Sequence, residues 1–194
     1  VLDFEDLGKI EIHGVKAEEL ISQNFIIHEH IDYFQIGTKD IDWMEGTDGN
    51  DYIDGYTAWT LVGGAMGLAS GNDRLEGGKG NDVLVGGISQ HFNGGYYKDI
   101  FIFNDNSGKD IIVDFTTRPS QFSELKDGGY ADIFQTNLLV NGTSINSATD
   151  IISNLEQTED GWALVNLGSD NTVVLHGVLP SDIDNTHFHV LPVT

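Results

Sequence analysis

The stretch that decides the fold is residues 77–85, which read GGKGNDVLV. The preceding nine residues, 68–76, read LASGNDRLE, and an earlier stretch, 46–54, reads GTDGNDYID. All three contain glycine, asparagine and aspartate in a row, followed after one residue by leucine or isoleucine. The chain therefore repeats a unit of nine residues that has one fixed apolar position.

A nine-residue period is too short for a helical repeat, and a single apolar position per unit suits a short strand. The six residues from the first glycine to the aspartate predict a turn, and the next three predict a strand whose middle residue points inward. Two such units make one coil of about 18 residues, and the coils stack into a parallel β-roll. The 24 glycines fit this architecture, because the turn backbone needs positive φ angles and passes close to a ligand.

The repeat weakens towards the C-terminus and is interrupted twice. Residues 94–102 keep the leading glycines and Asp99, and residues 107–112 keep a glycine, an aspartate and the apolar position. The two interruptions, 55–67 and 86–93, contain glycine but no aspartate.

Beyond Asp110 the pattern changes to longer strands. Residues 111–115 read as a strand and 116–131 as a loop, and further strands are expected around 132–140, 162–167 and 172–178. A helix is expected at 147–156, with Ser147 or Thr149 able to cap its N-terminus. The predicted fold is therefore all-β, a parallel β-roll flanked by antiparallel, β-sandwich-like capping segments.

A second repeat relates the two ends of the chain. Residues 1–27 align without gaps to residues 164–190 at a constant offset of 163, and the HGV at 13–15 falls on the HGV at 176–178. Most apolar positions match in kind, so both copies predict the same strands and polar turns. The first copy either covers the N-terminal end of the roll or completes a neighbouring module. Chance similarity of two amphipathic stretches is the competing interpretation.

These patterns divide the chain into three parts. They are an N-terminal β capping segment at 1–36, the β-roll at 37–115 and a C-terminal β-rich cap at 116–194.

The repeated aspartates predict a cation site. Stacked turns bring carboxylates within a few ångströms, and these cannot all stay ionised unless a cation neutralises them. The repeat offers oxygen donors without histidine or cysteine, which favours calcium, because calcium accepts about six to eight oxygens in flexible geometry. Ordinary solvated turns that use Asn and Asp for their turn propensity would explain one such unit, but not three in fixed register.

Residues 77–85 match the GGxGxDxUx nonapeptide, and the stretch from 45 to 115 resembles the calcium-binding β-roll of the repeats-in-toxin (RTX) family. The run DIFIFND…GKDIIVDF at 99–115 and the final GWALVNLGSDNTVVLHGV resemble the C-terminal parts of serralysin-type and related secreted proteins. The resemblance implies that each calcium ion lies between two turns on the same side of the roll. Aspartates and backbone carbonyls of both turns would bind it.

The resemblance also implies a ligand set. One site would use Asp51 and Asp73 with the carbonyls of Thr47, Gly49, Leu68 and Ser70. Another would use Asp82 and Asp99 with the carbonyls of Gly78 and Gly80, and Asp110 would serve a last, degenerate site. Because the interruptions at 55–67 and 86–93 lack aspartate, we expect few calcium ions, about two to five.

Composition narrows the function classes. Nine basic residues against 31 acidic ones give a net charge of −22, which disfavours nucleic acid and anionic lipid as partners. The absence of cysteine excludes disulfides, thiolate zinc sites and cysteine nucleophiles. No run of 18 apolar residues predicts a membrane span, and the N-terminal residues do not resemble an export signal.

Together with the resemblance, these features predict a non-catalytic, hemolysin-type calcium-binding module of a larger secreted or cell-surface bacterial protein. Such a module would use type I secretion, fold on extracellular calcium and support export, stability or adhesion. Calcium is the expected partner, with polysaccharide or other modules of the same protein as further partners.

Two other functions were weighed against this one. Aromatic residues in the interruptions, among them Tyr56, Trp59 and Tyr96, could stack on sugars in a carbohydrate-interacting accessory module of a polysaccharide-modifying enzyme or adhesin. Packing of these rings beneath their own loops is the competing interpretation. A zinc peptidase needs an HExxH motif, and HEHID at 28–32 lacks the second histidine. We expect no catalytic residues, and any catalytic domain would lie outside this chain.

Overall fold

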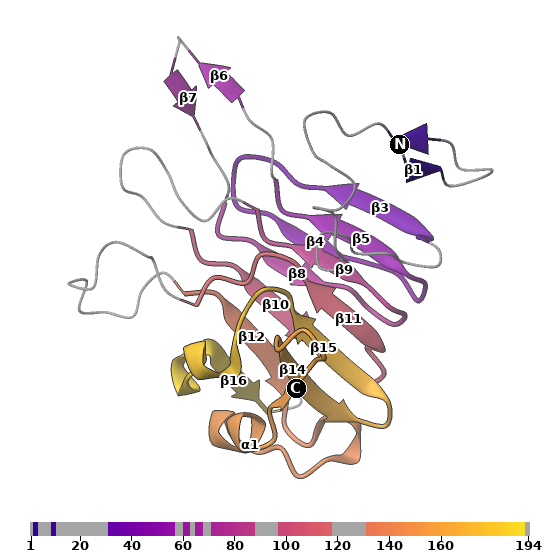
Figure 1. Ribbon diagram of the computed structural model, residues 1–194, viewed down its shortest axis with the longest axis vertical. Helices are drawn as coiled ribbons and strands as arrows, with labels where there is room; N and C mark the ends of the chain where they lie inside the picture. Colours follow the sequence, from indigo (N-terminus) through magenta and orange to yellow (C-terminus); the bar gives the residue numbers. More distant parts are fainter. Residues whose placement is uncertain are drawn as a thin grey trace.

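In the computed structural model, the chain winds through two sheets of short parallel strands (Figure 1). The structure describes residues 31–56, 71–87, 97–117 and 131–192. It also describes the backbone of two short antiparallel pairs, β1–β2 (Leu2–Asp3 and Lys9–Ile10) and β6–β7 (Thr60–Val62 and Ala65–Gly67). Successive strands of the roll alternate between the two sheets, which is the parallel β-roll expected from the nine-residue period.

The first sheet has five strands, and all its neighbouring strands are parallel. In spatial order they are β16 (Phe188–Leu191), β12 (Ile133–Asn137), β10 (Ile100–Phe103), β8 (Arg74–Glu76) and β4 (Trp43–Glu45). Because β12 and β16 come from the C-terminal part of the chain, the cap extends this roll sheet rather than forming a separate one.

The second sheet has seven strands and is parallel except at one end. The parallel strands are β3 (Tyr33–Ile36), β5 (Asp51–Asp54), β9 (Val83–Val85), β11 (Lys109–Ile112) and β15 (Asn171–Leu175). Antiparallel pairing follows from β15 to β14 (Ala163–Gly168) and β13 (Glu156–Gln157). Within the described cap, the expected antiparallel character is therefore confined to β13–β15.

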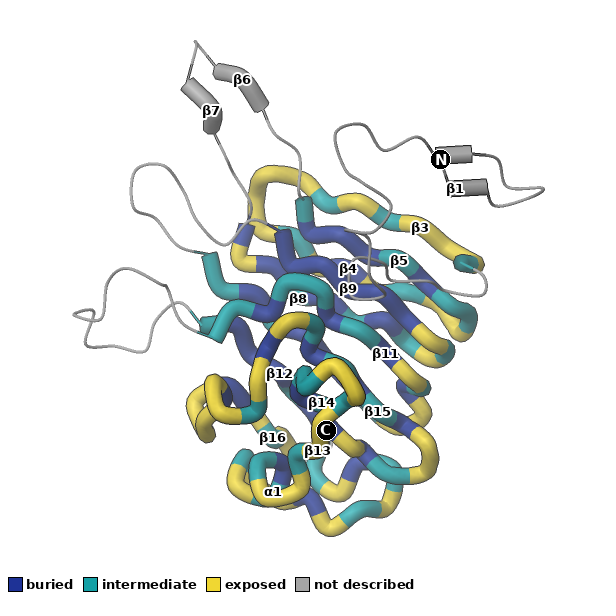
Figure 2. The backbone as a smooth tube through the Cα atoms, in the orientation of Figure 1, coloured by how far each residue is buried: buried dark blue, intermediate teal, exposed yellow. Residues whose placement is uncertain are grey.

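The core consists of one inward column of side chains from each sheet. Every short strand of the roll after β3 presents a buried apolar residue at the position that the repeat predicted (Figure 2), whereas β3 presents the half-buried Gln35. One column runs through Met44, Leu75, Phe101, Phe134 and Phe188. The other runs through Gln35, Ile53, Leu84, Ile112 and Leu175. Burying one such apolar side chain contributes roughly 1.5–3 kcal/mol, so the stacked columns stabilise the coils against one another.

The C-terminal cap covers the last coil with helical turns and strands. Helix α1 (Ala148–Ser153) begins at Ser147, whose side chain accepts a hydrogen bond from the Asp150 N–H, and it buries Ile151. Three 3₁₀ turns complete the cap: η4 (Val140–Gly142), η5 (Pro180–Asp182) and η6 (Asn185–His187). The helix expected at 147–156 is thus confirmed in a shorter form. No helix in the described parts of the chain is long and apolar enough to cross a membrane.

The two terminal hairpins share one register. In β1–β2, Leu2 lies opposite Ile10 and Asp3 opposite Lys9. In β14–β15, Val165 lies opposite Val173 and Asn166 opposite Thr172. Each residue of the first hairpin is 163 positions before its counterpart, which is the offset of the sequence repeat. Residues 11–27 of the first copy lie outside the described residues.

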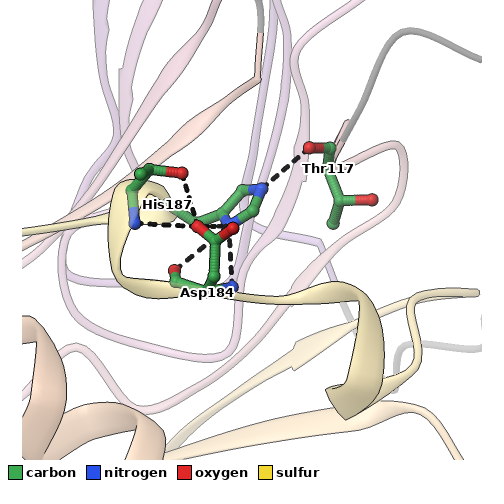
Figure 3. A network of polar contacts seen from close by, with 4 residues as sticks. Thr117, Asp184 and His187 are labelled. Atoms are coloured by element: carbon green, nitrogen blue, oxygen red, sulfur yellow. Dashed lines mark hydrogen bonds and ion pairs between the residues drawn. The ribbon is translucent and has the colours of Figure 1, made fainter. Parts of the chain in front are cut away.

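A buried histidine ties the cap to the last turn of the roll (Figure 3). The His187 side chain is 1 % exposed, and its Nε2 lies 2.8 Å from the carbonyl oxygen of Thr117. Its Nδ1 lies 3.0 Å from the backbone N–H of Asp184. A carbonyl only accepts hydrogen bonds, so Nε2 donates to Thr117, and Nδ1 accepts from Asp184. The imidazole therefore satisfies one backbone group on each side of this junction.

Replacing this histidine should weaken the junction. His187→Ala removes two buried hydrogen bonds and leaves a cavity, and we expect it to lower the free energy of unfolding by about 2–4 kcal/mol. Urea denaturation in calcium buffer measures this loss. The matched control is His189→Ala on the exposed face of β16, which should change stability by less than about 0.5 kcal/mol. Equal losses in both variants would contradict the role assigned to His187.

Candidate metal centre

Two stacks of turns connect the two sheets, one at each end of the short strands. Turns 46–50, 77–82 and 104–108 lead from the five-stranded to the seven-stranded sheet, and we call them turn stack one. Turns 37–42, 55–73, 86–99 and 113–132 lead back, and we call them turn stack two. The stretches 55–67 and 86–93 are therefore insertions within single turns of stack two, not separate repeat units.

Aspartates connect the turns of stack one into a ladder. The backbone N–H of Asp51 donates to Asp82 Oδ1 at 2.8 Å, and that of Asp82 donates to Asp110 Oδ1 at 2.9 Å. All three residues are at most 2 % exposed. The carboxylates of Asp82 and Asp110 thus reach back to the preceding coil, and we call the three aspartates the first ladder.

The same arrangement recurs in turn stack two. The N–H of Asp42 donates to Asp73 Oδ1, that of Asp73 to Asp99 Oδ1, and that of Asp99 to Asp132 Oδ1, at distances of 2.8–2.9 Å. Asp73, Asp99 and Asp132 are at most 1 % exposed. These four aspartates are the second ladder, and they continue across both long insertions.

Asparagines form a parallel set of contacts in the opposite direction. Asn50 Oδ1 accepts from the N–H of Asn81 at 2.8 Å, and Asn81 Oδ1 accepts from the N–H of Lys109 at 2.9 Å. In stack two, Asn72 Oδ1 accepts from the N–H of Lys98. These contacts explain why the repeat pairs asparagine with aspartate. The asparagine side chain bonds the backbone of the following coil, and the aspartate side chain bonds that of the preceding coil.

Three of the ladder carboxylates keep one oxygen without a hydrogen-bond partner. These atoms are Asp73 Oδ2, Asp82 Oδ2 and Asp110 Oδ2, all of them buried. Leaving a buried acceptor unsatisfied costs roughly 1–3 kcal/mol, and more when the group is charged. By contrast, Asp51 in the first unit accepts from the N–H and the hydroxyl of Thr47 within its own turn.

Glycines shape the space around these oxygens. Gly78 and Gly80 have φ angles of 98° and 112°, a region that L-residues rarely adopt. A methyl group on Gly78 would collide with the carbonyl oxygen of Thr47, and one on Gly80 with that of Gly49. A methyl group on Gly77 would collide with Asp82 Oδ2. Each of these glycines therefore leaves room where backbone and carboxylate oxygens of two adjacent turns meet.

Burial makes ionisation of the ladder carboxylates unfavourable. It raises the pKa of Asp73 and of Asp82 to about 7, and that of Asp110 to about 8, although a backbone N–H that bonds each carboxylate lowers the value. Burial also raises the pKa of Asp99, and the neighbouring carboxylate of Asp132 raises it further. Without a cation, these carboxylates would therefore still be partly protonated at neutral pH in the folded protein.

The donor set fits calcium. Within the described ranges, no three acidic or histidine side chains converge on one point, so backbone carbonyls must supply most ligands of a cation in either stack. The available donors are carbonyl and carboxylate oxygens, the ligands that calcium prefers, and calcium tolerates an irregular arrangement of them. In stack one, Asp82 with the carbonyls of Thr47 and Gly49 would hold one cation, and Asp110 with the carbonyl of Gly80 would hold the next.

The structure corrects the expected pairing of the aspartates. Asp51 and Asp73 belong to different ladders, and so do Asp82 and Asp99. The pairing was wrong because the sequence interpretation treated each insertion as a repeat unit, which shifted the count by one turn. The carbonyls of Thr47 and Gly49 do face the next turn, as expected. Leu68 and Ser70 lie outside the described residues, and the full ligand set stays a prediction.

The ladders include residues that sequence reasoning missed. Asp42 and Asp132 extend the second ladder by one turn at each end. Both lack the Gly-Asn that precedes Asp51, Asp73 and Asp82, but each is followed after one residue by a buried apolar side chain, and this spacing was a usable signal. Asp114 was missed as well: its two oxygens accept from the N–H groups of Gly86 and Gly87, at 2.8 and 2.9 Å.

Of the aromatic residues considered for sugar binding, Tyr56 lies in the part of the chain that the structure describes. Tyr56 is half-buried, and its backbone N–H donates to Asp54 Oδ1 at 2.9 Å. Trp59 and Tyr96 lie outside the described residues. Carbohydrate binding by these residues stays a prediction.

Comparison with known proteins identifies the repeat. Residues 36–57 and 69–89 match the family model of the RTX calcium-binding nonapeptide repeat, which describes four copies. The chain therefore carries RTX calcium-binding repeats, and these segments contain turns of both stacks. No curated protein matches the chain.

Among solved structures, the chain is similar to the solution structure of the AlgE6R3 subunit from the Azotobacter vinelandii mannuronan C5-epimerase. The two share 20% sequence identity with a TM-score of 0.41, and the alignment covers 84% of this chain and 86% of that chain.

The glycine cradle predicts a difference between two alanine substitutions. Gly80→Ala adds a methyl group where the Gly49 carbonyl faces the next turn, and Gly161→Ala adds one in open space at a similar φ of 86°. Both variants incur backbone strain of about 1–2 kcal/mol. Gly80→Ala should lose about 1–3 kcal/mol more and bind calcium at least about tenfold more weakly. Calcium titrations followed by circular dichroism measure both effects, and equal losses would contradict the cradle.

The raised pKa values predict an unusual pH dependence without calcium. A carboxyl with a higher pKa in the folded than in the unfolded state stabilises the fold fully below the unfolded value, and it loses this contribution as pH rises through the folded value. In chelator, stability should therefore fall as pH rises from about 4 to about 8, through the pKa values of Asp73, Asp82 and Asp110.

Thermal melts across this pH range, with chelator and with saturating calcium, measure the effect. In calcium the decline towards pH 8 should disappear, because the cation takes the place of the protons. A chelated protein that gains stability between pH 4 and pH 8 would contradict the assignment.

Proposed function

We propose that this chain is a non-catalytic, calcium-folded module of a larger bacterial protein that is secreted or displayed at the cell surface. Calcium binding between the turns converts an unfolded, highly acidic chain into the β-roll. The observation that carries this proposal is the set of buried carboxylate oxygens without partners on Asp73, Asp82 and Asp110. A fold that buries such atoms along two ladders needs a cation to hold them.

The charge of the whole chain supports a calcium-dependent fold. With a net charge of −22, the acidic side chains repel one another in the compact state. The ladders place some of these acidic side chains inside the protein. A cation that binds the folded state alone adds RT ln(1 + [L]/Kd), about 4.1 kcal/mol per site at a thousandfold excess over Kd. Several sites together therefore supply enough free energy to decide between folded and unfolded chain.

The ladders set the proposed number of ions. Two spaces lie between the three turns of the first ladder, and three lie between the four turns of the second. We infer up to five calcium ions between the described turns, which is the upper end of the range expected from the sequence. Asn171 ends stack one, since its Oδ1 accepts from the N–H of Gly108 and its Nδ2 donates to the carbonyls of Gly168 and Ser169.

Calcium-dependent folding gives the module its biological use. Where calcium is scarce, the chain stays unfolded and can pass through a type I exporter. Where calcium is plentiful, outside the cell, the roll folds and stabilises the protein of which it is part. The absence of cysteine fits this proposal, because the cation supplies the cross-links that disulfides supply elsewhere.

Removal of calcium tests the proposal directly. At pH 7.5 in chelator, far-UV circular dichroism should show a largely unfolded chain, and millimolar calcium should restore the β-roll. Magnesium at the same concentration is the control and should restore little, because magnesium retains its waters and requires octahedral geometry. A chain that is fully folded in chelator, with an unchanged melting temperature, would contradict the proposal.

Asp82→Asn should change stability in opposite directions with and without calcium. Asparagine keeps the Oδ1 acceptor for the N–H of Asp51 but removes the buried charge. In calcium the variant should bind the ion at least about tenfold more weakly, because a charged ligand is lost. In chelator at neutral pH it should be more stable than the parent, since burial of an unpaired carboxylate is relieved.

Asp182→Asn is the matched control for this substitution. It makes the same charge change on the exposed turn η5 and should leave both states nearly unchanged. Urea denaturation in calcium, and the folded fraction measured by circular dichroism in chelator, give the two differences. A shift of the same sign in both conditions for Asp82→Asn would contradict the role of this carboxylate.

A further inference from the structure

The C-terminal cap contains a cleft that is not lined by any aspartate of the two ladders. It lies between residues 143–145 after η4, residues 154–156 after α1 and the end of β14 at 166–168. Its volume is about 490 Å³, which is within the roughly 300–1,000 Å³ of small-molecule sites. In Figure 2 this part of the cap is at the lower end of the molecule, where α1 and β13 are labelled. The cap therefore has room for a small ligand.

The apolar part of this cleft is fixed by the fold. Ile145 is 4% exposed and belongs to the hydrophobic core, and the half-buried Leu155 packs against that core. Gly168 has a φ of 80°, and a methyl group on it would collide with the side chain of Thr143. The register of β14 against β15 shifts between Asn166 and Gly168, and an irregularity of this kind re-aims a side chain.

Three polar side chains at the rim of the cleft are held in place by the protein itself. Asn166 Nδ2 donates to Glu156 Oε1 at 2.8 Å, and Asn166 Oδ1 accepts from the N–H of Gly168 at 2.9 Å. Asn154 Nδ2 donates to the carbonyl of Asp150 at 2.7 Å. The three side chains belong to exposed residues, and a ligand usually has to order such side chains when it binds. Because hydrogen bonds already order them, binding here costs less conformational entropy.

The rim also keeps hydrogen-bonding atoms that the protein does not use. Among the described residues, no group bonds to Asn154 Oδ1, to Glu156 Oε2 or to the hydroxyl of Ser144. Asn166 Nδ2 has a second hydrogen besides the one that it donates to Glu156. The cleft thus offers two acceptors, one amide donor and one hydroxyl that can do either.

This mixture favours a ligand that is rich in hydroxyl groups, because a hydroxyl both donates and accepts. Carboxylates and phosphates only accept, no basic residue lines the described cleft, and the net charge of −22 repels anions. A cation would find a single carboxylate, Glu156, one oxygen of which already bonds Asn166. An apolar ligand would leave the buried parts of the polar rim without partners.

We propose that this cleft binds a neutral oligosaccharide. Hydroxyl groups of the sugar bond Asn154, Glu156 and Asn166, and a C–H face of its ring lies on Leu155. A sugar ring carries hydroxyl groups around an apolar C–H face, which matches a polar rim around an apolar floor. The site lies in the cap rather than in the calcium-binding turns, and no aromatic residue lines it in the part that the structure describes. It gives the module a partner other than calcium.

Titration of the full chain in calcium buffer, with amide chemical shifts recorded by NMR, tests the proposal. The neutral probes are maltohexaose, cellohexaose and mannohexaose, and the anionic probe is the hexamer of galacturonic acid. At least one neutral probe should bind saturably, with a Kd below about 5 mM, and shift the amides of 143–145, 154–156 and 166–168. The anionic probe should bind at least about tenfold more weakly. No saturable shift with any neutral probe, or equal binding of the anionic one, would overturn the proposal.

Variants in two different walls of the cleft locate the site. Asn154→Ala and Asn166→Ala each remove an amide that bonds the sugar, and each should weaken binding by at least about fivefold. Asn185→Ala is the matched control, because Asn185 is an exposed asparagine on η6 that does not line the cleft. It should bind the sugar as the parent does. If Asn166→Ala unfolds the cap, Asn154→Ala alone decides. Unchanged binding in a folded variant of Asn154 or Asn166 would overturn the proposal.

Discussion

The fold depends on keeping two rows of carboxylates buried between stacked turns. The aspartates of both ladders hydrogen-bond the backbone of the neighbouring coil and therefore hold the coils in register. The same burial raises the pKa of Asp73, Asp82 and Asp110 into the neutral range and leaves one oxygen of each without a partner. The buried carboxylates that align the coils thus also destabilise the folded state until a cation is bound.

The remaining features of the repeat follow from this constraint. Glycine at positions such as Gly78 and Gly80 leaves room for the carbonyls of the preceding turn, and asparagine adds a second backbone contact between coils. Between the turns, the short strands of the repeats present few inward side chains, so the hydrophobic core of the roll is narrow. A core of this size gives limited stability by itself. A bound cation therefore contributes a larger share of the free energy of folding.

Much of the fold could be predicted from the sequence, because its period specifies the architecture. The inward positions Ile53, Leu75 and Leu84, the turns between them and the helix capped by Ser147 all follow from local pattern. The pairing of aspartates across coils did not follow, since an insertion inside a turn and an extra repeat unit look alike along the chain. The hydrogen bonds from the Asp42 N–H to Asp73 Oδ1 and from the Asp73 N–H to Asp99 Oδ1 show that each long turn still returns to the same ladder. Residues such as Asp42 and Asp132 were missed because they keep the position of the motif without its glycines and asparagine.

The most direct test of the central claim is the location of calcium in crystals grown with it. An anomalous difference map should show ions between adjacent turns, with Asp73 Oδ2, Asp82 Oδ2 and Asp110 Oδ2 about 2.3–2.6 Å from them. The same three oxygens would then no longer be unsatisfied. Calcium-saturated crystals in which these oxygens contact no ion would contradict the account, since the fold would then hold buried carboxylates without the cation on which it is argued to depend.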